Sequence, residues 1–258
     1  KKAARVYPDE ILLRIGDTEI DSGTNIHALL NEKVGERVRI TVLSKQKKER
    51  SSVVRPIDKG QFNDLEYQRW VKDKRKKVEK WSSGKLGYVH IRGMSMPSFE
   101  QFEMELYAVA HGKEGLIIDV RNNGGGWTTY YMLAILSPRP HAYTIPRDGE
   151  KGYPLAERLP FYAWSKPIAA MCNEWSFSNA EIFPHAIKTL KRGQVVGAPT
   201  GGLVISTGGI RLIDGATFRV PFRGWYTLST GLNQENNGCI PDEIVWEQPG
   251  DRGNREDP

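Results

Sequence analysis

The sequence predicts a mixed α/β domain over residues 85–250, preceded by a smaller β-rich module. Two observations predict the α/β domain: apolar runs of strand length recur along it, and helix-like segments separate them. A third observation sets the module apart, because residues 1–57 carry strand and turn patterns with only one short helix signal. Hydrophobic residues make up 39% of the 258, which is sufficient for a packed core.

The β-rich module consists of short strands joined by turns. Gly16-Asp17 closes the first strand, and Thr24 is a candidate cap for a short helix. The predicted strands are residues 10–15, 19–20, 37–43 and 53–54. With the Tyr7-Pro8-Asp9 entry, this order resembles the later part of a bacterial-type PDZ domain over residues 3–57. No segment matches the carboxylate-binding loop of that family, so the resemblance implies only a partial module.

Residues 58–84 are predicted to form a basic helical linker. Apolar residues recur every three to four positions over residues 61–81, which is typical of a helix that packs through one face. They are Tyr67, Trp70, Val71, Val78 and Trp81. Residues 1–85 hold 21 Lys and Arg against 13 Asp and Glu, with much of the excess between Arg69 and Lys80. A nucleic-acid site would need aromatic platforms among these charges, so a solvated helix face is the favoured interpretation and no nucleic acid is expected.

The predicted α/β domain alternates strands and helices. Its strands are residues 86–91, 115–120, 167–173, 194–197, 210–213, 217–221 and 243–246, and its helices are residues 98–110, 128–136 and 178–191. The mostly apolar run at residues 115–120 predicts a strand buried on both faces. Ser98 and Gln101 have the spacing of a capping box, so we expect the first helix to begin there. A polar tail, residues 251–258, ends the chain.

Several function classes are disfavoured by composition. No run approaches the about 18 apolar residues that a membrane span needs, so no membrane span is expected. Cys172 and Cys239 are too few for a disulfide framework or a cysteine metal cluster. Cys172 follows an apolar run and is predicted to be a buried thiol. The opening residues 1–5 do not read as a natural start, so the location stays open between cytosol and periplasm.

Two predicted strands end in loops that can carry chemistry. The first loop runs from Asp119 to Trp127 and contains Gly124-Gly125-Gly126, which can present backbone N–H groups to an anion. A phosphate-binding loop would also need a lysine, which is missing after Gly126. A tight structural turn is the alternative interpretation of this loop.

The second loop places Ser178 where a strand gives way to a helix. A serine at that point can be the helix N-cap, or it can be a nucleophile beside the positive end of the helix dipole. Ser176 is a competitor for either role. Because both loops follow successive buried strands, a glycine amide and the amide after Ser178 can converge on one carbonyl oxygen, as in an oxyanion hole.

The ordered motifs resemble the peptidase domain of tricorn-like proteases and the related tail-specific proteases. The motifs are residues 119–126, residues 173–183, residues 211–215, Glu235-Asn236 with Gly238, and Pro241-Asp242. The similarity spans most of residues 68–248. It implies a crotonase-like α/β fold and a serine endopeptidase that acts on peptides or unfolded polypeptides, with no metal and no organic cofactor. It also implies that the chain can form homo-oligomers.

Site residues follow from this resemblance position by position. Ser178 matches the nucleophile, and the amides of Gly126 and Asn179 match the oxyanion donors. Glu235 matches the glutamate that helps to orient the charge relay. Thr144 stands roughly where tricorn-like proteases have an acidic residue, so a preference for Lys or Arg is not implied.

The general base is missing from the matched positions. The family's histidine belongs to a region before the PDZ module, and no lysine matches the base of the tail-specific proteases. The chain has five histidines, His27, His90, His111, His141 and His185. His185 lies seven residues beyond Ser178, about 10 Å along a regular helix, which is too far for a hydrogen bond. We therefore expect these 258 residues alone to be inactive or nearly so.

Three alternatives stay open. The chain can be a catalytically inactive peptide-binding or scaffold module with the same fold. It can bind a phosphate or nucleotide through Gly124–Gly126, although no metal-binding carboxylate pair is evident. A crotonase-like enzyme acting on thioesters uses similar paired amides, but no segment suggests a coenzyme A pocket.

Overall fold

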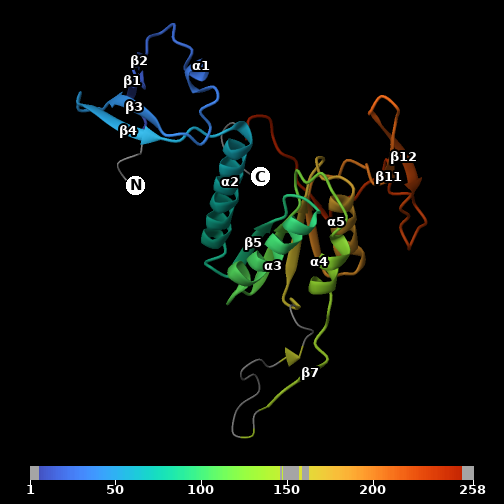
Figure 1. Ribbon diagram of the computed structural model, residues 1–258. Helices are drawn as coiled ribbons and strands as arrows, with labels where there is room; N and C mark the ends of the chain where they lie inside the picture. Colours follow the sequence, from blue (N-terminus) through green and yellow to red (C-terminus); the bar gives the residue numbers. More distant parts are fainter. Residues whose placement is uncertain (1–5, 146, 148–156, 159–162, 252–258) are drawn as a thin grey trace. The chain divides into compact units, whose positions relative to one another are not determined.

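A computed structural model describes residues 6–145, 147, 157–158 and 163–251 (Figure 1). The chain forms two compact units, residues 1–70 and 71–258, and the boundary between them falls inside helix α2 (Lys59–Trp81). The predicted linker, residues 58–84, is therefore one continuous helix over most of its length. The predicted polar tail lies outside the described residues except for Asp251.

The first unit contains a four-stranded antiparallel sheet in the order β2-β1-β3-β4. The strands are β1 (Ile11–Ile15), β2 (Thr18–Glu19), β3 (Val38–Leu43) and β4 (Glu49–Val54), and a short helix, α1, spans Ile26–Leu30. Its core is small: among the described residues of this unit, Ile15, Ile40 and Val42 are the buried apolar side chains. Asn25 rather than Thr24 caps α1, because the Asn25 side chain accepts the His27 and Ala28 N–H groups. The PDZ-like interpretation of residues 1–57 stays a prediction.

The second unit contains a five-stranded parallel sheet in the order β13-β10-β9-β6-β5. The strands are β5 (Leu86–His90), β6 (Gly115–Asp119), β9 (Ile168–Cys172), β10 (Gly193–Gly197) and β13 (Glu243–Ile244). This arrangement confirms the mixed α/β class expected from the alternating pattern. Strand β6 lies inside the sheet, between β9 and β5, and is largely buried, as its apolar run predicts.

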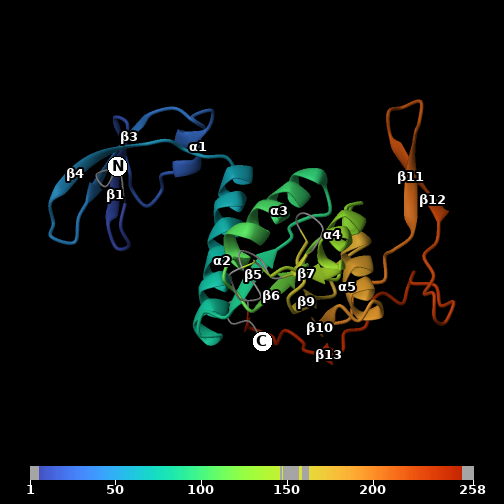
Figure 2. The ribbon, with the colours of Figure 1, turned by 90° about the horizontal axis from the view of Figure 1, so that it is seen from below.

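Three helices lie on one face of this sheet: α3 (Met96–Ala110), α4 (Thr129–Leu136) and α5 (Asn179–Thr189) (Figures 1 and 2). Phe102 and Phe183 are among the side chains that these helices bury completely against the sheet. Full burial of a phenylalanine contributes about 1.5–3 kcal/mol. Because the loop of residues 173–178 leads from β9 directly into α5, this packing also fixes the position of Ser178 at the start of α5.

Helix α3 begins earlier than the capping-box pattern predicts. The first helical residue is Met96, and Pro97 occupies the first turn, where its missing N–H costs nothing. Ser98 and Gln101 therefore lie inside the helix, and the prediction of a start at Ser98 is wrong. The Gln101 side chain instead donates to Glu105 one turn later, at 2.8 Å.

The apolar stripe of α2 is only partly buried. Val71 is buried, but Trp81 at the end of the helix is 69% exposed and lies under the Lys77 ammonium, 5.8 Å from the ring centroid. The prediction that Trp81 packs into a core is therefore wrong. Arg75 connects the helix to the sheet, donating to the Tyr88 carbonyl at 3.1 Å and pairing with Glu105.

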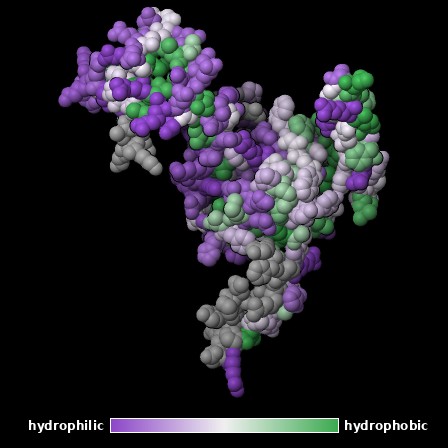
Figure 3. All heavy atoms as spheres, viewed as in Figure 1, coloured by the Kyte–Doolittle hydropathy of each residue, from purple (hydrophilic) through white to green (hydrophobic). Residues whose placement is uncertain are grey.

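A two-stranded hairpin, β11 (Ser206–Arg211) with β12 (Thr217–Arg223), carries exposed apolar side chains (Figure 3). Ile210 pairs directly with Phe218, and both are more than half exposed. The remaining described strands are β7 (Ala142–Tyr143) and β8 (Glu157–Arg158), which pair with each other. None of the described helices combines the length and apolar composition required to cross a membrane.

Candidate active site

The two loops singled out in the sequence meet at one edge of the parallel sheet. The glycine loop follows β6 and the serine loop follows β9, and these strands are neighbours, so their carboxyl ends lie side by side. Hydrogen bonds join the loops directly: Asn122 N–H donates to the Asn173 side chain at 3.0 Å, and Phe177 N–H donates to the Asn123 carbonyl at 2.9 Å. The candidate residues of both loops thus form one site.

Gly125 lies against Ser178 with no room for a side chain. A methyl group added at Gly125 would lie 2.6 Å from Ser178 Cβ and 3.2 Å from the Asn179 nitrogen. Its φ of 88° also belongs to the region that favours glycine. The glycine at this position is what allows the first loop to approach the serine.

Two backbone N–H groups at this contact are available to a ligand. Among the described residues, no group accepts a hydrogen bond from the N–H of Gly126 or from that of Asn179. Asn179 is the first residue of α5, where the positive end of the helix dipole adds to the attraction for an anion. The pair has the chemistry of an oxyanion hole.

Ser178 has a strained backbone. It occupies the N-cap position of α5 with φ 54° and ψ −120°. A residue other than glycine in such a sparsely populated region costs about 1–3 kcal/mol and persists only where its surroundings hold it. Ser178 N–H is held at 3.0 Å by the Leu203 carbonyl and at 3.1 Å by the Glu181 carboxylate.

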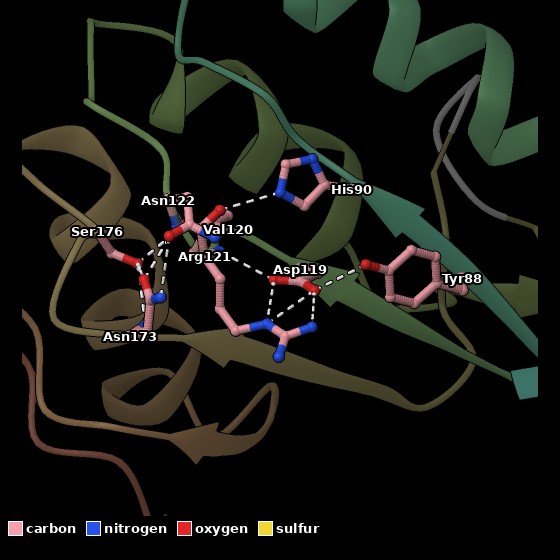
Figure 4. Close-up of polar contacts among 8 residues, drawn as sticks. All are labelled: Tyr88, His90, Asp119, Val120, Arg121, Asn122, Asn173 and Ser176. Atoms are coloured by element: carbon pink, nitrogen blue, oxygen red, sulfur yellow. Dashed lines mark hydrogen bonds and ion pairs between the residues drawn. The ribbon is translucent and has the colours of Figure 1, made fainter. Parts of the chain in front are cut away.

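Ser176, the competing serine, has a structural role. It is fully buried, and its hydroxyl donates to the Val120 carbonyl at 2.9 Å while accepting from Asn173 N–H at 3.1 Å (Figure 4). These bonds tie the serine loop to the end of β6. A hydroxyl that is buried and bonded in both directions is not available to attack a substrate.

Glu235 contacts the backbone beside Ser178. One oxygen of its carboxylate accepts the N–H groups of Val204 at 2.8 Å and Ile205 at 2.7 Å. Leu203, which precedes them, accepts the Ser178 N–H. The described contacts of Glu235 thus connect it to Ser178 through this segment; its role in a charge relay stays a prediction.

Glu181 is a site residue that the sequence reasoning missed. Its side chain is completely buried one turn into α5 and accepts hydrogen bonds from Ser178 and from the segment Thr200–Leu203. The signal was present in the sequence, because Ser178 and Glu181 have the same three-residue capping-box spacing as Ser98 and Gln101.

A buried ion pair, Asp119 with Arg121, lies where the glycine loop leaves β6 (Figure 4). Asp119, the last residue of β6, is fully buried and binds the Arg121 guanidinium at 2.6 Å and the Tyr88 hydroxyl at 2.7 Å. Burial raises the pKa of Asp119, but Arg121 outweighs it and holds the pKa below its ordinary value. The carboxylate is therefore ionised at neutral pH, at the residue where the loop begins.

His90 lies beside this pair and is not a free base. Its Nε2 is 3.0 Å from the Arg121 carbonyl, and the side chain is buried (Figure 4). Burial lowers the pKa of His90, against the opposing effect of Asp119. All five histidines lie in the described part of the chain, and none of them has a hydrogen bond to Ser178 there. His185 instead lies 3.3 Å from the Thr189 hydroxyl on its own helix.

Asn179 contributes a side chain as well as an amide. Its Oδ1 accepts the Thr129 N–H at 3.2 Å, and its carbonyl accepts the Thr129 hydroxyl at 2.9 Å. Thr129 is the first residue of α4, so Asn179 joins the N-terminal ends of two helices. The Asn179 side chain therefore supplies a hydrogen-bond acceptor to the first N–H group of α4.

Exposed aromatic side chains follow the glycine loop. Trp127 is the residue directly after Gly126 and is 54% exposed, with Tyr131 5.8 Å from it between ring centroids. Tyr130 on the same helix stacks on Trp225 at 6.3 Å. Exposed rings of this kind can pack against apolar side chains of a bound polypeptide.

The two cysteines are buried and chemically quiet. Burial raises the pKa of the Cys239 thiol to about 12, and burial also raises the pKa of Cys172. Because the thiolate is the reactive form, we expect iodoacetamide at pH 8 to alkylate the folded protein about 10³-fold more slowly than the unfolded chain. Intact-protein mass measured over time, with and without guanidinium chloride, checks this; rapid uptake by the folded protein would contradict it.

Other candidate sites are weaker. Within residues 6–145, 147, 157–158 and 163–251, no three His, Cys, Asp or Glu side chains come together in a way that could hold a metal ion. A surface cavity of about 600 Å³ is lined by Ile168 and Gly193, which begin β9 and β10, and by Lys188 and Asp242. It therefore lies at the opposite ends of the strands from Ser178.

Comparisons with known proteins agree with this arrangement. Residues 85–245 match the family model described as peptidase family S41. The chain is 32% identical over 244 residues to the tricorn protease of Thermoplasma acidophilum, covering 94% of this chain and 22% of that protein. It is also 32% identical to tricorn protease homolog 1 of Streptomyces coelicolor, covering 98% of this chain and 23% of that protein. The crystal structure of the tricorn protease superposes with a TM-score of 0.79 at 30% identity, covering 96% of this chain and 24% of that one. The chain thus spans less than a quarter of the length of these relatives.

Proposed function

The chain belongs to peptidase family S41, and on that premise we propose that it carries the active site of a serine endopeptidase. The observation that carries the proposal is the junction of the two loops, where strained Ser178 adjoins two unbonded backbone N–H groups. In the proposed reaction, Ser178 is the nucleophile and the Gly126 and Asn179 amides are the oxyanion donors. No metal or organic cofactor takes part.

The proposed chemistry is acyl transfer. Ser178 Oγ forms a bond to the scissile carbonyl carbon and gives its proton to a general base, and the carbonyl oxygen takes the electron pair. The N–H groups of Gly126 and Asn179 donate to that oxygen, an effect typically worth 10²–10³ in rate for each donor. Expulsion of the protonated amine leaves an ester on Ser178, which water hydrolyses to release the acid.

We propose that the general base is supplied by a residue outside these 258. The five histidines have no described hydrogen bond to Ser178, and no lysine has a motif that assigns it this role. Glu235 is proposed to orient the relay between that base and Ser178, supported by its contacts with Val204 and Ile205. The 258 residues alone are therefore expected to turn over little or no substrate.

The proposed substrates are peptides or unfolded polypeptides. The exposed rings of Trp127 and Tyr130 beside the oxyanion loop favour apolar substrate side chains. Thr144 carries no charge with which to select Lys or Arg. We further propose that copies of the chain associate with one another as part of a larger assembly.

Fluorophosphonate labelling tests the proposal. The 258-residue chain, a form extended at its N-terminus by the region found in the longer relatives, and Ser178→Ala in each are treated with the probe. We expect the extended form to label at Ser178 and the Ser178→Ala variant to lose labelling completely, because the probe reacts only with an activated hydroxyl. Exposed Ser229→Ala is the matched control and should label like the parent.

The runner-up is a catalytically inactive peptide-binding or scaffold module with the same fold. A folded extended form that never labels, yet binds unfolded polypeptide, would favour that function over the peptidase. Labelling that persists in Ser178→Ala would instead assign the nucleophile to another residue.

A further inference from the structure

Glu181 is a fully buried carboxylate that the proposed chemistry does not use. It is 0% exposed and lies three residues after Ser178 in the first turn of α5. A buried charge is unfavourable unless hydrogen bonds replace its lost hydration, so its partners indicate what it is there for.

All four described partners of Glu181 are hydrogen-bond donors. Oε1 accepts from the N–H groups of Ser178 at 3.1 Å and Leu203 at 2.8 Å. Oε2 accepts from Gly202 N–H at 2.6 Å and the Thr200 hydroxyl at 2.6 Å. Three of these donors are backbone amides that cannot reverse their role, so both oxygens of the Glu181 side chain must act as acceptors at this position.

These bonds connect the nucleophile position to the chain that runs beside it. Ser178 N–H also donates to the Leu203 carbonyl. Ser178 and Leu203 are therefore joined directly by this hydrogen bond and indirectly through Glu181, which accepts the N–H of each. The next two amides, those of Val204 and Ile205, are held by Glu235. Four consecutive N–H groups, residues 202–205, are therefore fixed by two glutamates.

Two glycines make room for the Glu181 carboxylate and the segment that it binds. A methyl group at Gly238 would lie 2.9 Å from Glu181 Oε2 and 2.6 Å from the Thr200 hydroxyl oxygen. At Gly202, whose φ is 73°, a methyl group would lie 2.9 Å from the Asn236 backbone. The absence of a side chain at both positions therefore allows the Glu181 carboxylate to contact residues 200–203.

We propose that Glu181 is a positioning residue for the reaction: its carboxylate holds the strained Ser178 in register with residues 200–203. This inference rests on the proposed function, since it assigns Glu181 to the same nucleophile. The strained conformation of Ser178 requires surroundings that hold it, and Glu181 binds the serine amide and its neighbour together. Loss of that link shifts the Ser178 hydroxyl relative to the oxyanion donors.

The test is Glu181→Gln in the N-terminally extended form. Glutamine has the same shape, but its NH₂ group faces two donors and repels the Gly202 N–H. A displacement of about 1 Å can cost 10²-fold in rate, so we expect kcat to fall by about 10–100-fold while KM changes less than about threefold. Glu100→Gln, an exposed glutamate on α3, is the matched control and should leave both constants unchanged.

Hydrogen–deuterium exchange provides a readout besides turnover. In Glu181→Gln, the amides of residues 202–203 should exchange faster, whereas those of β6 should be unaffected. Thr200→Val removes one donor and keeps three, and serves if Glu181→Gln does not fold; we expect a fall in kcat of about 3–10-fold.

The outcomes separate the two proposals. If the parent extended form never reacts at Ser178, the proposed function fails, and the positioning role fails with it. If the parent reacts and Glu181→Gln reacts with an unchanged kcat, the positioning role alone is overturned. Faster exchange at residues 202–203 together with a lower kcat and steady KM supports it.

Discussion

Replacing Gly126 with alanine is expected to lower the rate of Ser178 labelling in the N-terminally extended form by about 10³-fold. A methyl group at Gly126 would lie 2.0 Å from the Met94 carbonyl oxygen and 2.5 Å from its carbon, distances that no side chain can adopt. Its φ of 146° adds backbone strain for any residue with a Cβ. The obstacle is backbone rather than a flexible side chain, so the glycine loop itself must move.

That movement removes the proposed oxyanion donor. Trp127 N–H donates to the Met94 carbonyl at 2.7 Å, and Met94 N–H donates to the Gly125 carbonyl at 3.0 Å. Both bonds fix the direction of the Gly126 N–H between them. Loss of one oxyanion donor costs about 10²–10³ in rate, and the displaced loop accounts for the upper end of that range.

Gly124→Ala is the matched control two residues away. A methyl group at Gly124 meets nothing within 4 Å, and the residue does not require positive φ. It should label at the parent rate. The measurement is the second-order rate constant of labelling, with circular dichroism to verify folding. Equal rates for Gly126→Ala and the parent would show that the Gly126 amide is not a donor.

The contrast between Gly124 and Gly126 shows what could not be predicted from the sequence. The run Gly124–Gly126 predicts a loop that can approach a ligand, and this much followed from glycine's lack of a Cβ. The need for glycine at position 126, but not at position 124, depends on Met94, which comes 32 residues before Gly126 and meets it in an isolated bridge. A contact between distant segments of this kind is set by tertiary packing and leaves no local pattern.

The capping-box pattern likewise did not predict where helix α3 begins. The Ser98 and Gln101 pair predicted a helix start that the structure places at Met96, because Pro97 favours the first turn. Ser178 and Glu181 have the identical spacing at the true start of α5, where Glu181 accepts the Ser178 N–H. Spacing alone does not distinguish a residue inside a helix from one at its start.

The alternation of strands and helices was the most predictable feature. The central runs at residues 115–120 and 167–173 appear as β6 and β9, since short apolar segments of this length are buried best in a parallel sheet. The position of Ser178 at the start of α5 was likewise expected. The register between β5 and β6, which brings Tyr88 to Asp119, could not be read from the sequence.

Substituting Asp119 by asparagine is expected to reduce the free energy of unfolding of the second unit by about 3–5 kcal/mol at pH 7. Asp119 accepts the Tyr88 hydroxyl, the Arg121 N–H and the Arg121 guanidinium in a fully buried position. Removing one charge of a buried pair leaves the other insufficiently compensated, which is the costly case. Asparagine keeps the shape, so the loss reports the charge.

The pH dependence of this difference gives a second, independent signature. The pKa of Asp119 is lower in the folded protein than its ordinary value, which is about 3.9 in an unfolded chain. Its contribution is therefore fully present above about pH 4 and is lost as the pH falls through the folded-state pKa. The asparagine variant has no such titration. The difference in the free energy of unfolding between parent and variant should therefore narrow below about pH 4.

Urea unfolding followed by tryptophan fluorescence measures both effects, because six of the seven tryptophans lie in residues 71–258. Asp73→Asn, an exposed aspartate on α2, is the matched control and should differ from the parent by less than about 0.5 kcal/mol. A gap for Asp119→Asn that stays constant from pH 7 to pH 3 would mean that the variant loses packing rather than charge. A gap that closes assigns the stabilisation to the ionised carboxylate at the start of the glycine loop.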